Sequence, residues 1–132
     1  MSYNTTSFAN NPEMANSPGV LYFVVLVNKK TFERECCKIG ITKGTSWKDA
    51  VKRSKGFTGY DLRIQKVMHG TLEQVYNLEQ HLHEKYKEHS VVPQEDFGGK
   101  TECFSMSILK SVLQDLRELK NDLSSYSTKT DI

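Results

Sequence analysis

Long apolar runs and secretion signals are absent from the sequence. No segment approaches the roughly 20 apolar residues that a membrane-spanning helix needs, and the first residues lack the charged and apolar regions of a signal peptide. Cysteine is scarce: the 3 cysteines include one adjacent pair and no Cys-x-x-Cys spacing. An odd count of this kind argues against a disulfide framework or a structural zinc site. We therefore expect a cytoplasmic protein that does not associate with membranes.

The motifs of several common enzyme classes are also missing. The chain has no GxxxxGK[ST] phosphate loop, no HExxH zinc motif and no serine nucleophile elbow. His81 and His83 lie two positions apart in a predicted helix, so their rings face different directions and form a poor metal pair. Any chemistry must therefore come from polar residues that are scattered along the chain.

Charge is distributed unevenly, although the formal net charge of the 132 residues is only +2. Residues 29–66 contain eleven Lys or Arg and four acids, whereas residues 67–132 contain seven Lys or Arg and eleven acids. The basic excess therefore lies in the first half of the expected folded part. It is either an ordinary solvated surface or a surface that faces the phosphates of a nucleic acid.

The apolar pattern predicts an α+β domain over residues 18–123, between polar tails at residues 1–17 and 124–132. The first tail is expected to be disordered and the second flexible, since neither has an apolar period. We expect a small three-stranded, mainly antiparallel sheet flanked by three helices. The predicted strands, of which the first two form a hairpin, are Val20–Val27, Cys36–Thr42 and Asp61–His69. The predicted helices cover residues 46–55, residues 71–88 and a segment from Ser107, and Thr101–Phe104 is a short extended piece.

The helix predicted over residues 71–88 contains an unusual carboxylate. Thr71 and Gln74 have the spacing of a capping box. Glu79 falls in the stripe formed by the apolar residues Leu72, Val75, Leu82 and Tyr86. A carboxylate on such a face needs a partner, because burying the charge alone is costly. Glu79 is therefore either a core residue paired to an Arg or to a nearby hydroxyl, or a metal-binding or catalytic residue.

Four polar residues have the chemistry to hydrolyse a phosphodiester bond together: Tyr22, Lys38, Arg53 and Glu79. The reaction needs an activated water, positive charge for the developing phosphate and usually a divalent metal held by carboxylate. If the first two strands form a hairpin, Tyr22 and Lys38 lie near each other on one face of the sheet, and Gly40 lets backbone approach beside them. Taken singly, Tyr22 is also typical of a core residue and Lys38 of a solvated strand residue.

This ordered series resembles the GIY-YIG endonuclease superfamily over about Gly19–Leu116. Val20-Leu21-Tyr22 corresponds to the GIY tripeptide of that family, and Lys38-Ile39-Gly40 corresponds to its YIG tripeptide. Arg53 follows on a helix, and Glu79 stands in LEQHLHEKY much like the metal-binding glutamate of the family. Thr101-Glu102-Cys103-Phe104 is similar to the T-E-x-F ending of a phage and bacterial branch, whose second motif often begins with Lys.

The resemblance implies a metal-dependent endonuclease that hydrolyses DNA. In that family the helix glutamate holds a metal ion (Mg²⁺, or Mn²⁺), the first-motif tyrosine is a candidate general base, and the arginine faces the scissile phosphate. These roles fall on Glu79, Tyr22 and Arg53. Lys38 stands where the family has a tyrosine, and it would hold the water or the phosphate instead. The gap between the second motif and Arg53 is longer than the family commonly shows, so Arg63 is the alternative for the arginine.

The remaining expectations concern binding, partners and support. The basic residues expected to bind nucleic acid are Lys43, Lys48, Lys52, Lys55 and Arg63. Gly40, Glu102 and Phe104 are expected to be structural, with Glu102 as the partner of a basic residue rather than a second metal ligand. The substrate is expected to be DNA, with RNA as the alternative, and specificity would come from a homodimer or a partner protein. A phage-encoded protein would act in the host cytoplasm. The competing functions are an inactive nuclease-fold module that binds nucleic acid or protein, and a regulatory protein whose basic face binds an acidic partner.

Overall fold

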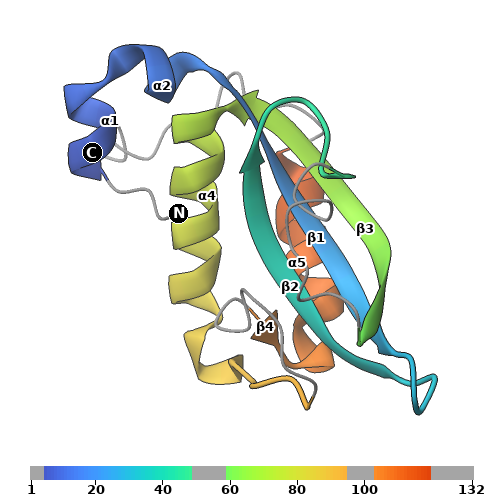
Figure 1. The fold of residues 1–132 in the computed structure, drawn as a ribbon. Coiled ribbons are helices and arrows are strands. Elements are labelled where there is room, and N and C mark those ends of the chain that lie inside the picture. Colours follow the sequence, from blue (N-terminus) through green and yellow to red (C-terminus); the bar gives the residue numbers. More distant parts are fainter. Residues whose placement is uncertain (1–4, 49–58, 95–102, 120–132) are drawn as a thin grey trace.

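The protein is an α+β domain built on one antiparallel sheet (Figure 1). The structure is a computed structural model and describes residues 5–48, 59–94 and 103–119. The sheet has four strands in the order β3-β1-β2-β4. Their bounds are β1 Pro18–Asn28, β2 Arg34–Lys43, β3 Tyr60–Thr71 and β4 Cys103–Phe104. The three predicted strands are therefore confirmed, and the prediction of a three-stranded sheet is corrected by the addition of β4 at the edge.

Strand β1 is the centre of the sheet because it pairs with β2 on one side and with β3 on the other. Its apolar residues from Val20 to Leu26 are all buried. A strand that is covered on both faces reads as a continuous apolar run rather than as an alternation. The predicted hairpin of the first two strands is also confirmed, since β1 and β2 pair antiparallel with Tyr22 opposite Gly40.

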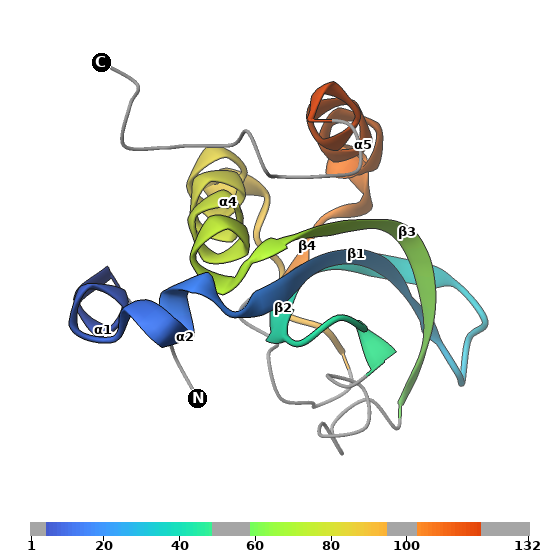
Figure 2. The ribbon, with the colours of Figure 1, turned by 90° about the horizontal axis from the view of Figure 1, so that it is seen from above.

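The two faces of the sheet bury two separate apolar clusters. One cluster contains Leu21, Phe23 and Val25. It is covered by helices α4 (Leu72–Lys85) and α5 (Leu109–Glu118), which lie side by side on that face (Figure 2). We call this the helix face. The other cluster contains Tyr22, Val24 and Leu26, which alternate along β1 with the residues of the first cluster. We call this side of the sheet the Tyr22 face. Adjacent Cys36 and Cys37 are buried on opposite faces, as the strand alternation predicts.

Helix α4 (Leu72–Lys85) begins with the predicted capping box. The Oγ1 of Thr71 accepts a hydrogen bond from the backbone N–H of Gln74 at 3.1 Å, and the Oε1 of Gln74 accepts one from the N–H of Thr71 at 2.9 Å. A cap of this kind stabilises a helix by about 1 kcal/mol. The predicted apolar stripe is buried throughout: Leu72, Val75, Leu82 and Tyr86. A single turn of 3₁₀ helix, Lys87–His89, follows the helix.

The last helix of the described residues completes the core of the helix face. A 3₁₀ turn, Met106–Ile108, leads into α5 (Leu109–Glu118), which buries Val112 and Leu116. The helix predicted from Ser107 is therefore confirmed. Residues 49–55 of the predicted helix at 46–55 and the predicted tail at 124–132 lie outside the described residues. Among the residues that the structure covers, no helix combines the length and the apolar character that crossing a membrane requires.

The prediction that residues 1–17 are disordered is wrong for residues 5–17, which are the part of this segment that the structure describes. Residues Thr5–Asn10 form α1 and Pro12–Asn16 form α2, and both pack beside α4 (Figure 1). Phe8 is only 2% exposed, and its ring meets Tyr76 edge-on with the centroids 5.2 Å apart. The Oδ1 of Asn11 caps α2 by accepting from the N–H of Met14 at 3.1 Å. Phe8 in α1 and Ala15 in α2 are buried against the rest of the domain, so tertiary contacts rather than an apolar period hold the two helices.

A carboxylate network fixes the far end of the β1–β2 hairpin. Glu35 accepts hydrogen bonds from Asn28 Nδ2 at 2.9 Å, from the hydroxyl of Tyr60 at 2.8 Å and from the N–H of Gln94 at 2.7 Å. Burial raises the pKa of Glu35, but these three hydrogen bonds outweigh it and bring the pKa below its ordinary value. The charged carboxylate therefore ties the hairpin to β3 and to the segment after α4.

Candidate functional site

The register of β1 and β2 places Tyr22 and Lys38 on the same face of the sheet. Tyr22 is opposite Gly40, and Val24 is opposite Lys38, so Tyr22 and Lys38 are diagonal neighbours. The Nζ of Lys38 lies over the ring of Tyr22, 5.3 Å from its centroid. This is the distance of a cation–π contact. The structure therefore confirms the predicted proximity of these two side chains.

Gly40 provides the space in which the two polar groups meet. A Cβ atom built on Gly40 would lie 2.6 Å from the hydroxyl oxygen of Tyr22 and 2.8 Å from the Nζ of Lys38. Both groups therefore converge on the point that a side chain at this position would occupy. Any residue larger than glycine would have to displace them, so the prediction that Gly40 allows a close approach is confirmed.

Both polar side chains of this cluster are buried. Tyr22 is 4% exposed and Lys38 is 2% exposed. Lys38 is therefore not a solvated strand residue. A buried ammonium needs compensating contacts because it has lost its hydration, and the ring of Tyr22 supplies one of them. A positive charge held away from water acts more strongly on a nearby negative group than it would at the surface.

Glu79 lies on α4, and the same helix is fixed to the strand segment that carries the cluster. Glu79 is 5% exposed, and its Oε1 accepts a hydrogen bond from Gln80 Nε2 at 3.3 Å. One turn further on, the Nε2 of His83 is 3.1 Å from the carbonyl oxygen of Ile39, which lies between Lys38 and Gly40. A carbonyl oxygen only accepts, so Nε2 must carry the proton in this contact. The prediction that Glu79 is on the buried stripe of its helix is confirmed.

His83 is a residue whose role the sequence did not reveal. It contacts β2 through Ile39, and its ring centroid lies 5.4 Å from that of Phe104. Phe104 is buried in β4 and supports the helix at this point, which agrees with its expected structural role. One feature of the sequence could have indicated this role: His83 follows Glu79 by four residues, so both lie on the same side of the helix.

Glu79 has the chemistry to hold a divalent metal as a single carboxylate. No group of three or more His, Cys, Asp or Glu that would form a metal cage occurs in the part of the chain that the structure describes. Mg²⁺ is commonly bound by one or two carboxylates, with water and substrate phosphates completing its shell. The buried Glu79 fits a magnesium site of that kind better than a site built from His and Cys.

No family model, curated protein or solved structure matches this chain. The resemblance to the GIY-YIG superfamily therefore stays a prediction, and the site must be judged from its own geometry.

The other predicted site residues are distributed over different parts of the structure. Arg53, Lys52, Lys55 and Glu102 lie outside the described residues. Lys43 and Lys48 are exposed near the end of β2. Arg63 is exposed, but it pairs with Val25 and so belongs to the helix face, opposite to Tyr22. Arg63 is therefore poorly placed to replace Arg53 beside Tyr22 and Lys38.

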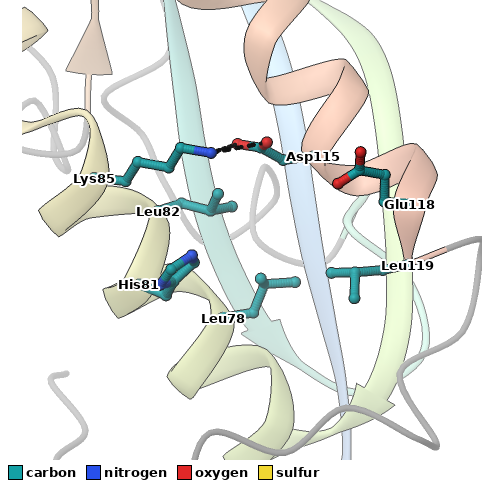
Figure 3. A pocket seen from close by; sticks show the side chains of 7 residues that line it. All are labelled: Leu78, His81, Leu82, Lys85, Asp115, Glu118 and Leu119. Carbon is teal, nitrogen blue, oxygen red and sulfur yellow. Dashed lines mark hydrogen bonds and ion pairs between the residues drawn. The ribbon is translucent and has the colours of Figure 1, made fainter. Parts of the chain in front are cut away.

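A cavity of about 220 Å³ lies between α4 and α5, away from the Tyr22 face. Figure 3 shows the Nζ of Lys85 reaching across to Asp115 at its rim, at 2.9 Å. Burial and the hydrogen bond to Asp115 raise the pKa of the neighbouring Tyr86. The lining residues are Leu78, His81, Leu82, Lys85, Asp115, Glu118 and Leu119. Tyr22, Lys38 and Glu79, the candidate catalytic residues that the structure describes, do not line this cavity, so we do not assign it to the candidate site.

Proposed function

We propose that the protein is a metal-dependent endonuclease that hydrolyses phosphodiester bonds in DNA. The observation that carries this proposal is the convergence of the buried Tyr22 hydroxyl and the buried Lys38 ammonium on the space at Gly40. Glu79 stands on α4, which covers the opposite face of the sheet and reaches the same segment of β2 through the contact of His83 with the carbonyl oxygen of Ile39. The resemblance of the sequence to the GIY-YIG superfamily supports the same function.

Each group has a role that follows from its chemistry. The hydroxyl of Tyr22 can accept a hydrogen bond from water and is the candidate general base. Lys38 supplies positive charge where the phosphate becomes more negative in the transition state. Glu79 would hold Mg²⁺ or Mn²⁺, and a bound ion of this kind polarises a phosphoryl oxygen. Arg53 remains the proposed contact to the scissile phosphate by resemblance alone.

Phosphate contacts outside the site are proposed for exposed cations of the basic segment. Lys43 and Lys48 lie near the end of β2 and are exposed. They would position the nucleic acid without reading its sequence. The proposed substrate is therefore DNA with little sequence preference, and specificity would come from a second copy of the chain or from a partner protein.

Incubation of the wild-type protein with supercoiled plasmid tests the proposal. Nicked or linear products are expected with Mg²⁺ or Mn²⁺ and are expected to disappear with EDTA. A folded protein that leaves both plasmid DNA and single-stranded RNA intact with either metal would contradict a nuclease function. Cleavage that persists in EDTA would contradict the role of the metal.

A second candidate function is binding of nucleic acid without cleavage. The replacement of the second-motif tyrosine by Lys38 favours it, because one aromatic hydroxyl expected from the family is missing. A protein of this kind would shift DNA in a gel mobility assay and show no cleavage with either metal. Because the buried Lys38 still provides a charge next to Tyr22, we favour the nuclease.

A further inference from the structure

The tip of the β1–β2 hairpin holds an aromatic residue in an unfavourable conformation. Phe32 has φ of 62°, and it is the only non-glycine residue with positive φ among those that the structure describes. This region of backbone conformation suits glycine, asparagine or aspartate, and a bulky residue there is an outlier. Phe32 is also 83% exposed, so packing does not explain the choice of side chain.

Hydrogen bonds hold this tip in one shape. The N–H of Phe32 donates to the carbonyl of Asn28 at 2.7 Å, and the N–H of Asn28 donates to the carbonyl of Glu33 at 2.9 Å. The side-chain oxygen of Asn28 accepts from the N–H groups of Lys30 and Thr31 at 2.8 and 3.2 Å. Asn28 itself is buried and bonded to Glu35. These hydrogen bonds fix the backbone of the loop, so the exposed ring of Phe32 is held in a defined position.

The charges around the ring are mainly positive. Lys29, Lys30 and Arg34 are exposed at the tip, and Glu33 is the exposed acid among them. Figure 1 shows that the hairpin loop projects beyond the rest of the sheet. An exposed aromatic ring with cations on both sides is the combination that proteins use to stack on a base while contacting the adjacent phosphates. A membrane anchor would need a larger apolar surface than one ring provides.

We propose that the Phe32 tip (residues 29–34) is a second nucleic-acid contact, in which the ring stacks on an unstacked base and Lys29, Lys30 and Arg34 contact phosphates. This inference rests on the proposed function and adds a substrate class to it: DNA in which a base is unpaired or a strand is single. In an intact duplex the ring would first have to separate two stacked bases, which costs unstacking energy. The tip therefore favours flaps, bulges and single strands over perfect duplex.

The length of the hairpin sets the spacing between this contact and the candidate site. Tyr22 and Asn28 are six residues apart in β1, which corresponds to about 20 Å of strand. Stacked bases are about 3.4 Å apart. DNA that lies along the hairpin would therefore span at least about six nucleotides between the phosphate that is cut and the tip.

The test measures binding of fluorescent oligonucleotides in EDTA, so that binding is separated from cleavage. Phe32→Asn removes the ring and places a residue that tolerates positive φ at the same position. We expect affinity for bulged and single-stranded DNA to fall roughly tenfold, with little change for perfect duplex. The melting temperature should stay level or rise, because the strained conformation is relieved. Phe32→Trp should keep the affinity, since it keeps a stacking surface.

A matched control separates stacking from general loss of apolar surface. Val92 is 78% exposed and lies in the segment after α4, outside residues 29–34, so Val92→Ala should bind all substrates like the wild type. If Phe32→Asn binds bulged DNA as tightly as the wild type, the tip contact is refuted while the proposed nuclease function stands. If the wild type binds no DNA and no RNA, the proposed function fails and the tip inference fails with it. Phe32-dependent binding to anionic phospholipid vesicles, without DNA binding, would overturn the inference in favour of a membrane contact.

Discussion

Substitution of Gly40 by alanine tests the geometry of the candidate site. The new Cβ would lie 2.6 Å from the Tyr22 hydroxyl, 2.7 Å from Cζ of its ring and 2.8 Å from the Nζ of Lys38. Carbon atoms pack at about 3.5–4.0 Å, so both side chains must move by close to 1 Å. The Lys38 ammonium is the end of a flexible chain, but the ring of Tyr22 is buried in its cluster. Overpacking of this kind costs about 1–3 kcal/mol of unfolding free energy.

The same displacement is expected to reduce cleavage more than stability. A misplacement of about 1 Å can cost about 100-fold in rate, so Gly40→Ala should cut plasmid DNA about 100-fold more slowly while remaining folded. Ile39→Val is the matched control, because Ile39 lies on the other face of β2. This substitution should lower the free energy of unfolding by about 0.5–1.5 kcal/mol without adding an atom between Tyr22 and Lys38. Urea unfolding and initial cleavage rates measure both quantities. Equal cleavage by Gly40→Ala and Ile39→Val would refute the argument that Tyr22 and Lys38 act from this space.

Two further predictions concern charge. Lys38→Met keeps an unbranched stem but removes the ammonium, so cleavage should fall by about 100-fold or more; wild-type cleavage would contradict this role. The lowered pKa of Glu35 means that its stabilising effect is complete above the ordinary value of 4.5 and is lost as the pH falls through the folded-state pKa. Glu35→Gln should therefore be less stable than the wild type by about 1 kcal/mol at pH 7, and urea unfolding in acid should show the difference closing; a difference that is constant with pH would contradict the network.

The central elements of the fold were predictable because their sequence signals are local. The apolar run of β1, the turn-linked pairing with β2 and the capping box of Thr71 and Gln74 each depend on neighbouring residues. The register also followed, because a hairpin fixes which residues share a face. That is why the proximity of Tyr22 and Lys38 was predictable before the structure.

The parts that were missed depend on contacts between distant segments. Among the side chains of α1 and α2 whose burial the structure describes, only Phe8 and Ala15 are buried, so this polar sequence shows no apolar period. A short extended piece at residues 101–104 was expected, but its joining the sheet as β4 was not, because the two-residue strand depends on pairing with Cys37 and Lys38. Strand alternation assigns Lys38 to a face but says nothing of what covers that face, so its burial was not foreseen. The contact of His83 with Ile39 likewise depends on how α4 docks.

Glu79→Gln tests the central claim most directly, because the proposal makes this buried carboxylate the metal ligand. The substitution keeps the shape and removes the charge. Glu84→Gln is the control on the same helix, since Glu84 is exposed and pairs with Lys87 at the surface. Plasmid cleavage with Mg²⁺, measured beside DNA binding and thermal melts with Mg²⁺ and with EDTA, is the decisive comparison. We expect Glu79→Gln to bind DNA, remain folded and fail to cut, whereas Glu84→Gln should cut like the wild type. A Glu79→Gln protein that is destabilised with and without Mg²⁺ and still cuts at the wild-type rate would contradict the central claim.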